Sequence, residues 1–258
     1  MAERTGDKTG AFEERAWFGD RPVEAAEKPG LVRGVFASVA SRYDLMNDLM
    51  SGGVHRLWKR TMIDRLAPRP GETVVDVAGG TGDIAFRIHA RTGGAARIVV
   101  CDLTPSMLAV GQDRAIDRGI LSGIEWIAGD AEALPFADRT ADACAIAFGL
   151  RNVTHPESAL AEMHRILKPG GRFVCLEFSR VVPAGLRDLY DRYSRSALPA
   201  LGAIVARDRG SYEYLVESIR RFPPQEELAA MMREAGFAQV SWRNLSAGIA
   251  ALHVGWRV

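Results

Sequence analysis

The chain has 258 residues, of which 47% are hydrophobic and 25% are charged, and its formal net charge is +1. This length suits one large domain or a domain with an appended lid. A near-neutral chain without a dense Lys/Arg tract argues against a nucleic-acid partner. A polar start and no apolar run of about 18 residues predict neither a signal peptide nor a membrane span. Three cysteines without C-x-x-C spacing favour a reducing cytoplasm over a disulfide framework or a metal site.

The first elements are irregular and then helical. Residues 1–30 are charged, which predicts a loose N-terminal tail, and residues 31–258 are expected to form a single domain. Within it, residues 31–70 hold two N-terminal helices, because apolar residues recur at helical spacing over 31–50 and 55–66.

Strands and helices alternate through residues 71–179, the expected cofactor-binding core. Such alternation is typical of an α/β fold in which helices cover both faces of a parallel sheet. The expected strands are 73–77, 97–102, 124–128, 143–148 and 172–178, and the expected helices are 82–92, 105–118 and 157–166. The tetrapeptide Lys168–Gly171 is predicted as a helix stop and turn.

The pattern changes after the fifth strand. Residues 180–221 form a long insertion with several tyrosines, which predicts a cap over the substrate. Residues 222–258 are expected to form a C-terminal helix, at 225–235, and a closing hairpin of two strands.

A glycine-rich turn separates the first strand of the core from its first helix. Residues 73–83 read T-V-V-D-V-A-G-G-T-G-D, and a strand, tight turn and helix in this order surround a nucleotide-like ligand with backbone N–H groups. Gly79, Gly80, Thr81 and Gly82 are therefore candidate cofactor contacts. The segment also fits G-x-G-x-x-A, so a dinucleotide-binding oxidoreductase stays open at this point.

Acids that follow three strands favour S-adenosylmethionine over NAD. Asp102 closes the second strand, where a carboxylate can accept hydrogen bonds from both ribose hydroxyls. Asp76 can meet a cationic group, and Asp130 or the N–H of Ala131 can contact an adenine. A turn or helix-cap role is the alternative for Asp130. Asp83 could either cap the helix or approach the amino end of the cofactor.

Two polar residues leave the fourth strand in F-G-L-R-N-V-T, residues 148–154. Arg151 could stabilise an oxyanion and Asn152 could hydrogen-bond one, because ligands bind at this edge of such sheets. A salt bridge within a turn is the alternative. His253 is a further candidate base, with a packed core histidine as its alternative, and Tyr43 is a candidate for either the site or the core.

Five segments together resemble the ubiquinone/menaquinone biosynthesis C-methyltransferases. They cover residues 32–258 in unbroken order and include 35–51, V-D-V-A-G-G-T-G-D at 75–83, F-G-L-R-N-V-T, 167–179 and Y-L-V-E-S-I-R-R-F-P-P-Q-E-E-L at 214–228, followed by G-I-A-A-L-H. The resemblance implies a class I S-adenosylmethionine-dependent methyltransferase. Its fold is a Rossmann-like, mostly parallel seven-stranded sheet with a closing antiparallel hairpin, N-terminal helices and an inserted cap.

The resemblance also implies S-adenosylmethionine as cofactor and a polyprenylated hydroquinone as acceptor, either 2-polyprenyl-6-methoxy-1,4-benzoquinol, a demethylmenaquinol, or both. Carried over by motif, Thr81, Asp102 and the Asp130–Ala131 pair are cofactor contacts. Many members have Asn in place of Asp130, and some have Ser in place of Ala147, so a hydroxyl contact at that position is absent.

Methylation at carbon needs a nucleophilic ring and an in-line methyl sulfonium in a dry site, and it requires no metal. We expect Arg151 to stabilise the quinolate or to assist proton removal, and Asn152 to orient the ring oxygen. Tyr43 would contribute from the N-terminal helix folded over the pocket. A bilayer-resident acceptor predicts peripheral attachment to the cytoplasmic membrane face, and exposed edges permit a homodimer or association with other quinone-biosynthesis enzymes. Another phenol or sterol methyltransferase and a non-catalytic binding module remain alternatives.

Overall fold

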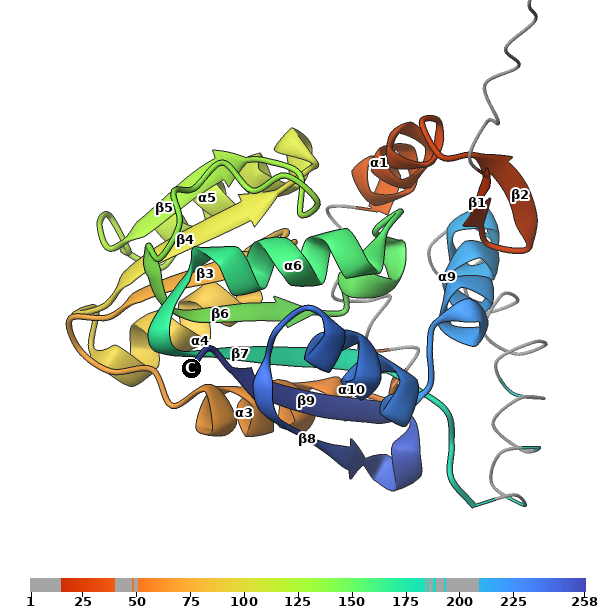
Figure 1. The fold of residues 1–258 in the computed structure, drawn as a ribbon. Helices are drawn as coiled ribbons and strands as arrows, with labels where there is room; N and C mark the ends of the chain where they lie inside the picture. Colours follow the sequence, from red (N-terminus) through yellow and green to blue (C-terminus); the bar gives the residue numbers. More distant parts are fainter. Residues whose placement is uncertain are drawn as a thin grey trace, which may run out of the picture.

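A single seven-stranded sheet forms the centre of the computed structural model, which describes residues 15–39, 48, 51–183, 185, 188, 193 and 209–258 (Figure 1). The strand order is β5-β4-β3-β6-β7-β9-β8. Five strands are parallel, and β9 runs antiparallel to both β7 and β8. The strands are β3 (Thr73–Val77), β4 (Arg97–Asp102), β5 (Ile124–Ala128), β6 (Ala141–Ala147), β7 (Leu167–Phe178), β8 (Ala238–Leu245) and β9 (Ala250–Trp256). The expected mostly parallel sheet with a closing hairpin is confirmed.

Side chains of the central strands alternate between two apolar layers. In β3, Val74 packs into one layer, whereas Val75 and Val77 pack into the other. Both faces are buried, which explains why these strands are continuously apolar in the sequence. One layer is completed by α3 (His55–Leu66), α4 (Asp83–Thr92) and α5 (Pro105–Asp117), and the other by α6 (Pro156–Ile166) and α10 (Gln225–Glu234).

The order of the strands reverses beside β3. The chain passes from β3 outward through β4 to β5, and then returns to β6, which pairs with the other side of β3. A crevice opens where two such halves diverge at the carboxyl ends of parallel strands. The short 3-10 helix η2 (Leu150–Asn152) leaves β6 at this edge, and η5 (Ser246–Gly248) joins β8 to β9.

Three elements lie beyond the carboxyl ends of the parallel strands. They are the hairpin of β1 (Arg15–Phe18) and β2 (Arg21–Glu24), the helix α1 (Lys28–Val39) and the helix α9 (Arg209–Arg221), all on the right-hand side of Figure 1. The expectation of a loose tail over residues 1–30 is therefore wrong for residues 15–30. The hairpin is held by α9, a helix nearly 200 positions away, which no local sequence pattern reveals.

Some expected boundaries also change. Strand β6 ends at Ala147 because Phe148 has φ 57°, a left-handed conformation that breaks the strand. The tetrapeptide expected as a turn is instead a bulge inside β7, since Ala141 pairs with Leu167 and Ala143 with Arg172. Most of the insertion expected over 180–221 lies outside the described residues, as does the second half of the helix expected over 31–50.

Candidate functional site

A pocket occupies the crevice at the carboxyl ends of β3, β4 and β6. Its wall includes the turn between β3 and α4, the end of β4, the loop between β5 and β6, the turn after β6, and the helices α1 and α3. The residues predicted as cofactor contacts that line it are Asp76, Gly79, Gly80, Thr81, Asp102, Asp130 and Ala131, and Asn152 lines the same pocket. The fold thus brings the two predicted groups of residues together.

The turn between β3 and α4 requires glycine for two different reasons. A Cβ on Gly79 would lie 2.6 Å from Oδ2 of Asp76 and 2.8 Å from the Val100 side chain, so no larger residue fits. Gly82, just before α4, has φ +80°, and a Cβ there would lie 2.5 Å from the Trp126 ring. Gly82 itself does not line the pocket, so its contribution is to shape the turn.

Asp102 fixes this turn from the end of β4. Its Oδ2 accepts a hydrogen bond from the N–H of Gly80 at 2.9 Å, and its Oδ1 accepts one from the N–H of Thr104 at 2.8 Å. Burial raises the pKa of Asp102, although the two N–H groups oppose this. Each oxygen keeps a second lone pair, so the carboxylate can still accept from two ribose hydroxyls.

Asp76 is the least satisfied polar group at the site. Its side chain is completely buried, and within the described chain neither carboxylate oxygen has a hydrogen-bond partner. Burial, together with the negative charges of Asp83 and Asp102, raises its pKa to about 8. A buried polar group without a partner at the end of a strand marks a place that a cationic group would complete.

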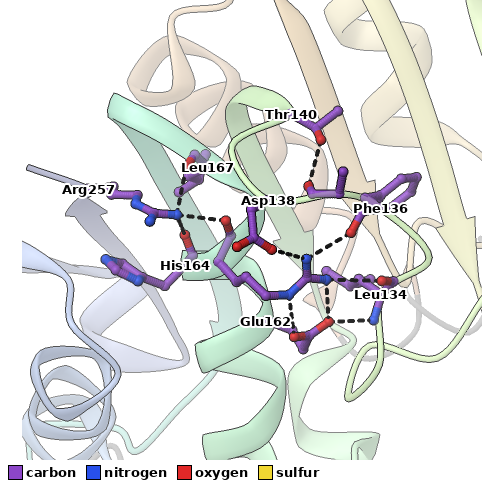
Figure 2. A network of polar contacts seen from close by, with 10 residues as sticks. Leu134, Phe136, Asp138, Thr140, Glu162, His164, Leu167 and Arg257 are labelled. Carbon is purple, nitrogen blue, oxygen red and sulfur yellow. Dashed lines mark hydrogen bonds and ion pairs between the residues drawn. The ribbon is translucent and has the colours of Figure 1, made fainter.

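The loop that carries Asp130 and Ala131 is held from behind by α6. Oδ1 of Asp130 accepts from the N–H of Glu132 at 2.9 Å, so the turn role considered for this residue is present, while the residue also lines the pocket. Figure 2 shows part of the support, in which Glu162 accepts from the N–H of Leu134. Arg165 binds Glu162 and the carbonyls of Leu134 and Phe136. This network fixes the loop that lines the pocket.

Thr81 lines the pocket with a hydroxyl whose proton is directed by Arg114. Nη1 of Arg114 donates to Oγ1 of Thr81 at 3.0 Å, and Thr81 is buried. Because the hydroxyl oxygen already accepts one hydrogen bond, its own hydrogen can be donated to a ligand.

Arg151, the residue expected to stabilise the quinolate or to assist proton removal, is not among the residues that line the pocket. Its guanidinium is fully buried and donates to Oε1 of Glu177 at 2.7 Å and to the carbonyl of Phe148 at 2.6 Å. The salt-bridge alternative therefore describes its main contacts. Glu177 lies on β7, 26 positions away, and nothing in the motif itself indicates it as the partner.

Asn152 lines the pocket and is oriented by α9. Oδ1 of Asn152 accepts from the hydroxyl of Tyr214 at 3.0 Å, and its Nδ2 makes only a long contact of 3.4 Å with the carbonyl of Phe148. The amide can therefore still donate a hydrogen bond to a ligand.

The other two candidates, His253 and Tyr43, are not found in the pocket wall of the described chain. His253 is buried on β9, where its Nε2 contacts the carbonyl of Gln225 at 2.8 Å, and it does not line the pocket. The packed-histidine alternative describes it. Tyr43 lies outside the described residues, so its predicted role is neither supported nor opposed by the structure.

Two parts of the wall escape the sequence-based prediction. Pro29, Val32 and Phe36 of α1 form an apolar side of the pocket, and Lys59 of α3 places a buried charge in it. A signal for Lys59 exists, since it lies three and four positions before the buried Met62 and Ile63, on the same face of the helix. A lysine at a core position of an amphipathic helix is unusual and points to a buried partner.

Comparison with known proteins points to methyltransferases. The model of the ubiE/COQ5 methyltransferase family matches residues 23–257. The chain is 59% identical over 241 residues to the ubiquinone/menaquinone biosynthesis C-methyltransferase UbiE of Paracoccus denitrificans (strain Pd 1222), covering 93% of this chain and 96% of that protein. It is 54% identical over 243 residues to the protein of the same name in Brucella abortus (strain S19), covering 93% and 90%. A solved SAM-dependent methyltransferase of Thermotoga maritima shares the fold, with a TM-score of 0.63 at 20% identity over 88% of this chain and 100% of that chain.

Proposed function

This chain belongs to the ubiE/COQ5 methyltransferase family, and we propose that it transfers a methyl group from S-adenosylmethionine to a ring carbon of a polyprenylated hydroquinone. The acceptor is a 2-polyprenyl-6-methoxy-1,4-benzoquinol, a demethylmenaquinol, or both, in the biosynthesis of ubiquinone and menaquinone. The observation that carries this function is one pocket lined on one side by the buried acids Asp76 and Asp102 and on the other by Asn152. An NAD-dependent oxidoreductase is no longer an alternative, because the family is one of methyltransferases.

The described residues fit the cofactor by their donor and acceptor types. Asp102 would accept from the ribose hydroxyls, the Asp130–Ala131 pair would contact the adenine, and Thr81 would donate from its hydroxyl. Asp76, a buried carboxylate with no partner in the described chain, would meet the ammonium of the methionyl part. When bound, S-adenosylmethionine supplies an electrophilic methyl group on a sulfonium.

The acceptor must be made nucleophilic at carbon and aligned with that methyl group. Loss of a phenolic proton raises the electron density at the ring carbon ortho to the oxygen, so a hydrogen-bond donor near that oxygen both holds the ring and stabilises the quinolate. Nδ2 of Asn152 is a donor in the pocket wall that can do this. Pro29, Val32 and Phe36 of α1 exclude water from the same space, which favours neutralisation of the two charges.

Arg151 would then act from behind the wall as a positioning residue. Its backbone N–H contacts Oε2 of Glu177 at 3.3 Å, and its guanidinium contacts Oε1, so the pair ties the turn after β6 to β7. Nε and Nη2 of Arg151 are buried and have no hydrogen-bond partner in the described chain. These donors do not line the pocket, whereas Asn152 does, so we assign the hydrogen bond to the ring oxygen of the quinol to Asn152.

The test is product identification. The protein is incubated with methyl-labelled S-adenosylmethionine and, separately, a prenylated benzoquinol, a demethylmenaquinol and a soluble phenol, each under reducing conditions. Mass analysis should find one added methyl group on carbon in one or both prenylated quinols. Methylation of the soluble phenol at an equal rate, or attachment of the methyl group to oxygen, would contradict the proposed acceptor.

A further inference from the structure

Lys59 places a buried positive charge in the pocket that none of the roles above uses. Its side chain is only 4% exposed, and its Nζ lies 2.7 Å from Oδ2 of Asp83 and 5.9 Å from the centre of the Phe148 ring. Lysines are rarely buried to this degree unless they are paired, and this pair lies on the wall of a ligand pocket. Burial of an ammonium costs free energy, so a buried lysine is expected to have a binding or structural role that offsets this cost.

Asp83 does not use up the charge of Lys59. Arg87, one helical turn further along α4, also binds Asp83, with its Nε 3.1 Å from Oδ1. Burial would raise the pKa of Asp83, but the charges of Lys59 and Arg87 outweigh it and lower the pKa below its ordinary value. The three side chains together therefore carry a net positive charge of one. Of the two cations, only Lys59 lines the pocket.

This cluster lies close to the unpartnered carboxylate of Asp76. The charges of Asp83 and Lys59 both act on Asp76, in opposite directions, and all three residues line the same pocket. The methionyl end of the site thus contains one buried carboxyl group without a hydrogen-bond partner in the described chain and one buried cation in a net-positive cluster. A ligand end that carries both an ammonium and a carboxylate matches these two groups, because the ammonium would favour the charged form of Asp76.

We propose that Lys59 binds the α-carboxylate of the methionyl part of the methyl donor, while Asp76 takes its α-ammonium. This deepens the proposed function and rests on it. Asp83 holds the Lys59 ammonium in place, so the carboxylate meets a donor that is already oriented and already desolvated. Lys59 is a binding residue in this assignment and takes no part in proton transfer.

The test compares S-adenosylhomocysteine with its decarboxylated analogue, which keeps the thioether, the adenosine and the ammonium. Calorimetric affinities are measured for the wild type, for Lys59→Met, and for Arg60→Met as the matched control, because Arg60 is an exposed cation of the same helix that does not line the pocket. The wild type and Arg60→Met should prefer S-adenosylhomocysteine by roughly 10- to 100-fold. Lys59→Met should bind the two ligands within about threefold of each other.

Three results would contradict the assignment. The first is a wild type that binds both ligands with equal affinity, and because it needs no variant, the assignment can be tested even if Lys59→Met does not fold. A Lys59→Met protein that keeps the full preference also overturns it, as does one whose only defect is a raised KM for the quinol. Failure of the wild type to bind S-adenosylhomocysteine at all would instead contradict the proposed function.

Discussion

The surroundings of Asp76 disfavour the charged form of its side chain. It is a fully buried carboxylate at the end of a central strand, and its pKa is raised to about 8 by burial and by the neighbouring acids Asp83 and Asp102. In the unfolded chain the same group has an ordinary pKa near 4. At neutral pH, Asp76 therefore lowers the stability of the ligand-free protein, and a ligand ammonium would remove the cause.

Asp76→Asn should accordingly stabilise the ligand-free protein and weaken cofactor binding. Between pH 4 and pH 8 the folded state holds a proton on Asp76 that the unfolded state has released, so wild-type stability falls with rising pH relative to the variant. From below pH 4 to pH 8, the stability of the variant relative to the wild type should rise by several kcal/mol, up to roughly 5, because each unit of the pKa shift is worth about 1.4 kcal/mol. The corresponding rise in Tm is up to about 10–20 °C. The measurement is thermal unfolding of both proteins across this range.

The same variant should bind S-adenosylhomocysteine at least about tenfold more weakly, because the amide cannot pair with the ammonium. The difference between wild-type and variant stability below pH 4 serves as the control, since both side chains are then neutral. A constant difference in stability from pH 4 to pH 8 would show that Asp76 does not titrate in this window.

Single residues also show what the sequence can predict about the site. Asp76, Asp102 and Asp130 follow parallel strands, so their meeting at one edge follows from topology. The partner of Arg151 does not, because Glu177 lies on a different strand and only the folded register brings it near. Lys59 is missed because a lysine in an amphipathic helix is normally assigned to the solvent face.

At the scale of elements, the hairpin β1–β2 and the helix α9 form one unit over the turn after β6. Phe18 stacks on Tyr214 with ring centres 4.4 Å apart, Arg221 lies 3.6 Å from the Trp17 ring centre, and Glu217 accepts from the N–H of Asp20 at 3.0 Å. Tyr214 in turn donates to Asn152. Two segments from opposite ends of the chain thus orient a side chain of the pocket.

This arrangement predicts that the Tyr214 hydroxyl matters for turnover. Burial raises the pKa of Tyr214 to about 12, so the hydroxyl keeps its proton and remains a donor to Asn152. Tyr214→Phe should lower kcat for the quinol roughly 5- to 30-fold, because the amide loses the contact that orients it. The affinity for S-adenosylhomocysteine should stay within about twofold, since no adenosine contact changes.

Two further variants test whether Tyr214 acts by orienting Asn152 or whether its substitution disturbs the helix in general. Tyr212→Phe removes a hydroxyl from a buried tyrosine of the same helix that does not bond Asn152, and it should keep wild-type turnover. Adding Tyr214→Phe to Asn152→Ala should cost nothing more, because the acceptor is already absent. Additive losses in the double variant would contradict a role for Tyr214 through Asn152.

Elements also mark the limit of local sequence reasoning. The parallel strands and their helices are predicted well, since each buries a face whose spacing is visible in the sequence. The four-residue strands of the N-terminal hairpin are too short to be stable alone. They depend on α9, and contacts between residues about 200 positions apart leave no local pattern.

At the scale of the whole molecule, the cofactor residues and the covering elements lie on the same edge of the sheet. The acids come from the ends of the parallel strands, while α1, the hairpin and α9 lie beyond those ends (Figure 1). α1 is tied across the edge by Lys28, whose Nζ donates to the carbonyl of Val153 at 2.7 Å. The part of the pocket wall that α1 contributes is therefore fixed to the turn after β6.

A prenylated acceptor resides in a bilayer, so the protein must reach the membrane to bind it. None of the described helices is long and apolar enough to cross a membrane. We therefore propose that the protein attaches peripherally to the cytoplasmic membrane face. The apolar segment 197–206, which lies outside the described residues, is the part of the sequence best suited to this contact.

Flotation with liposomes tests this attachment. The wild type should rise with vesicles of anionic phospholipid, and more of it should rise when the vesicles contain a prenylated quinol, because the bound tail adds buried apolar surface. A variant with Leu198, Leu201, Ile204 and Val205 replaced by serine should float less, yet keep its affinity for S-adenosylhomocysteine, which reports an intact cofactor pocket. A wild type that stays at the bottom with and without quinol would mean that the acceptor is delivered by another route.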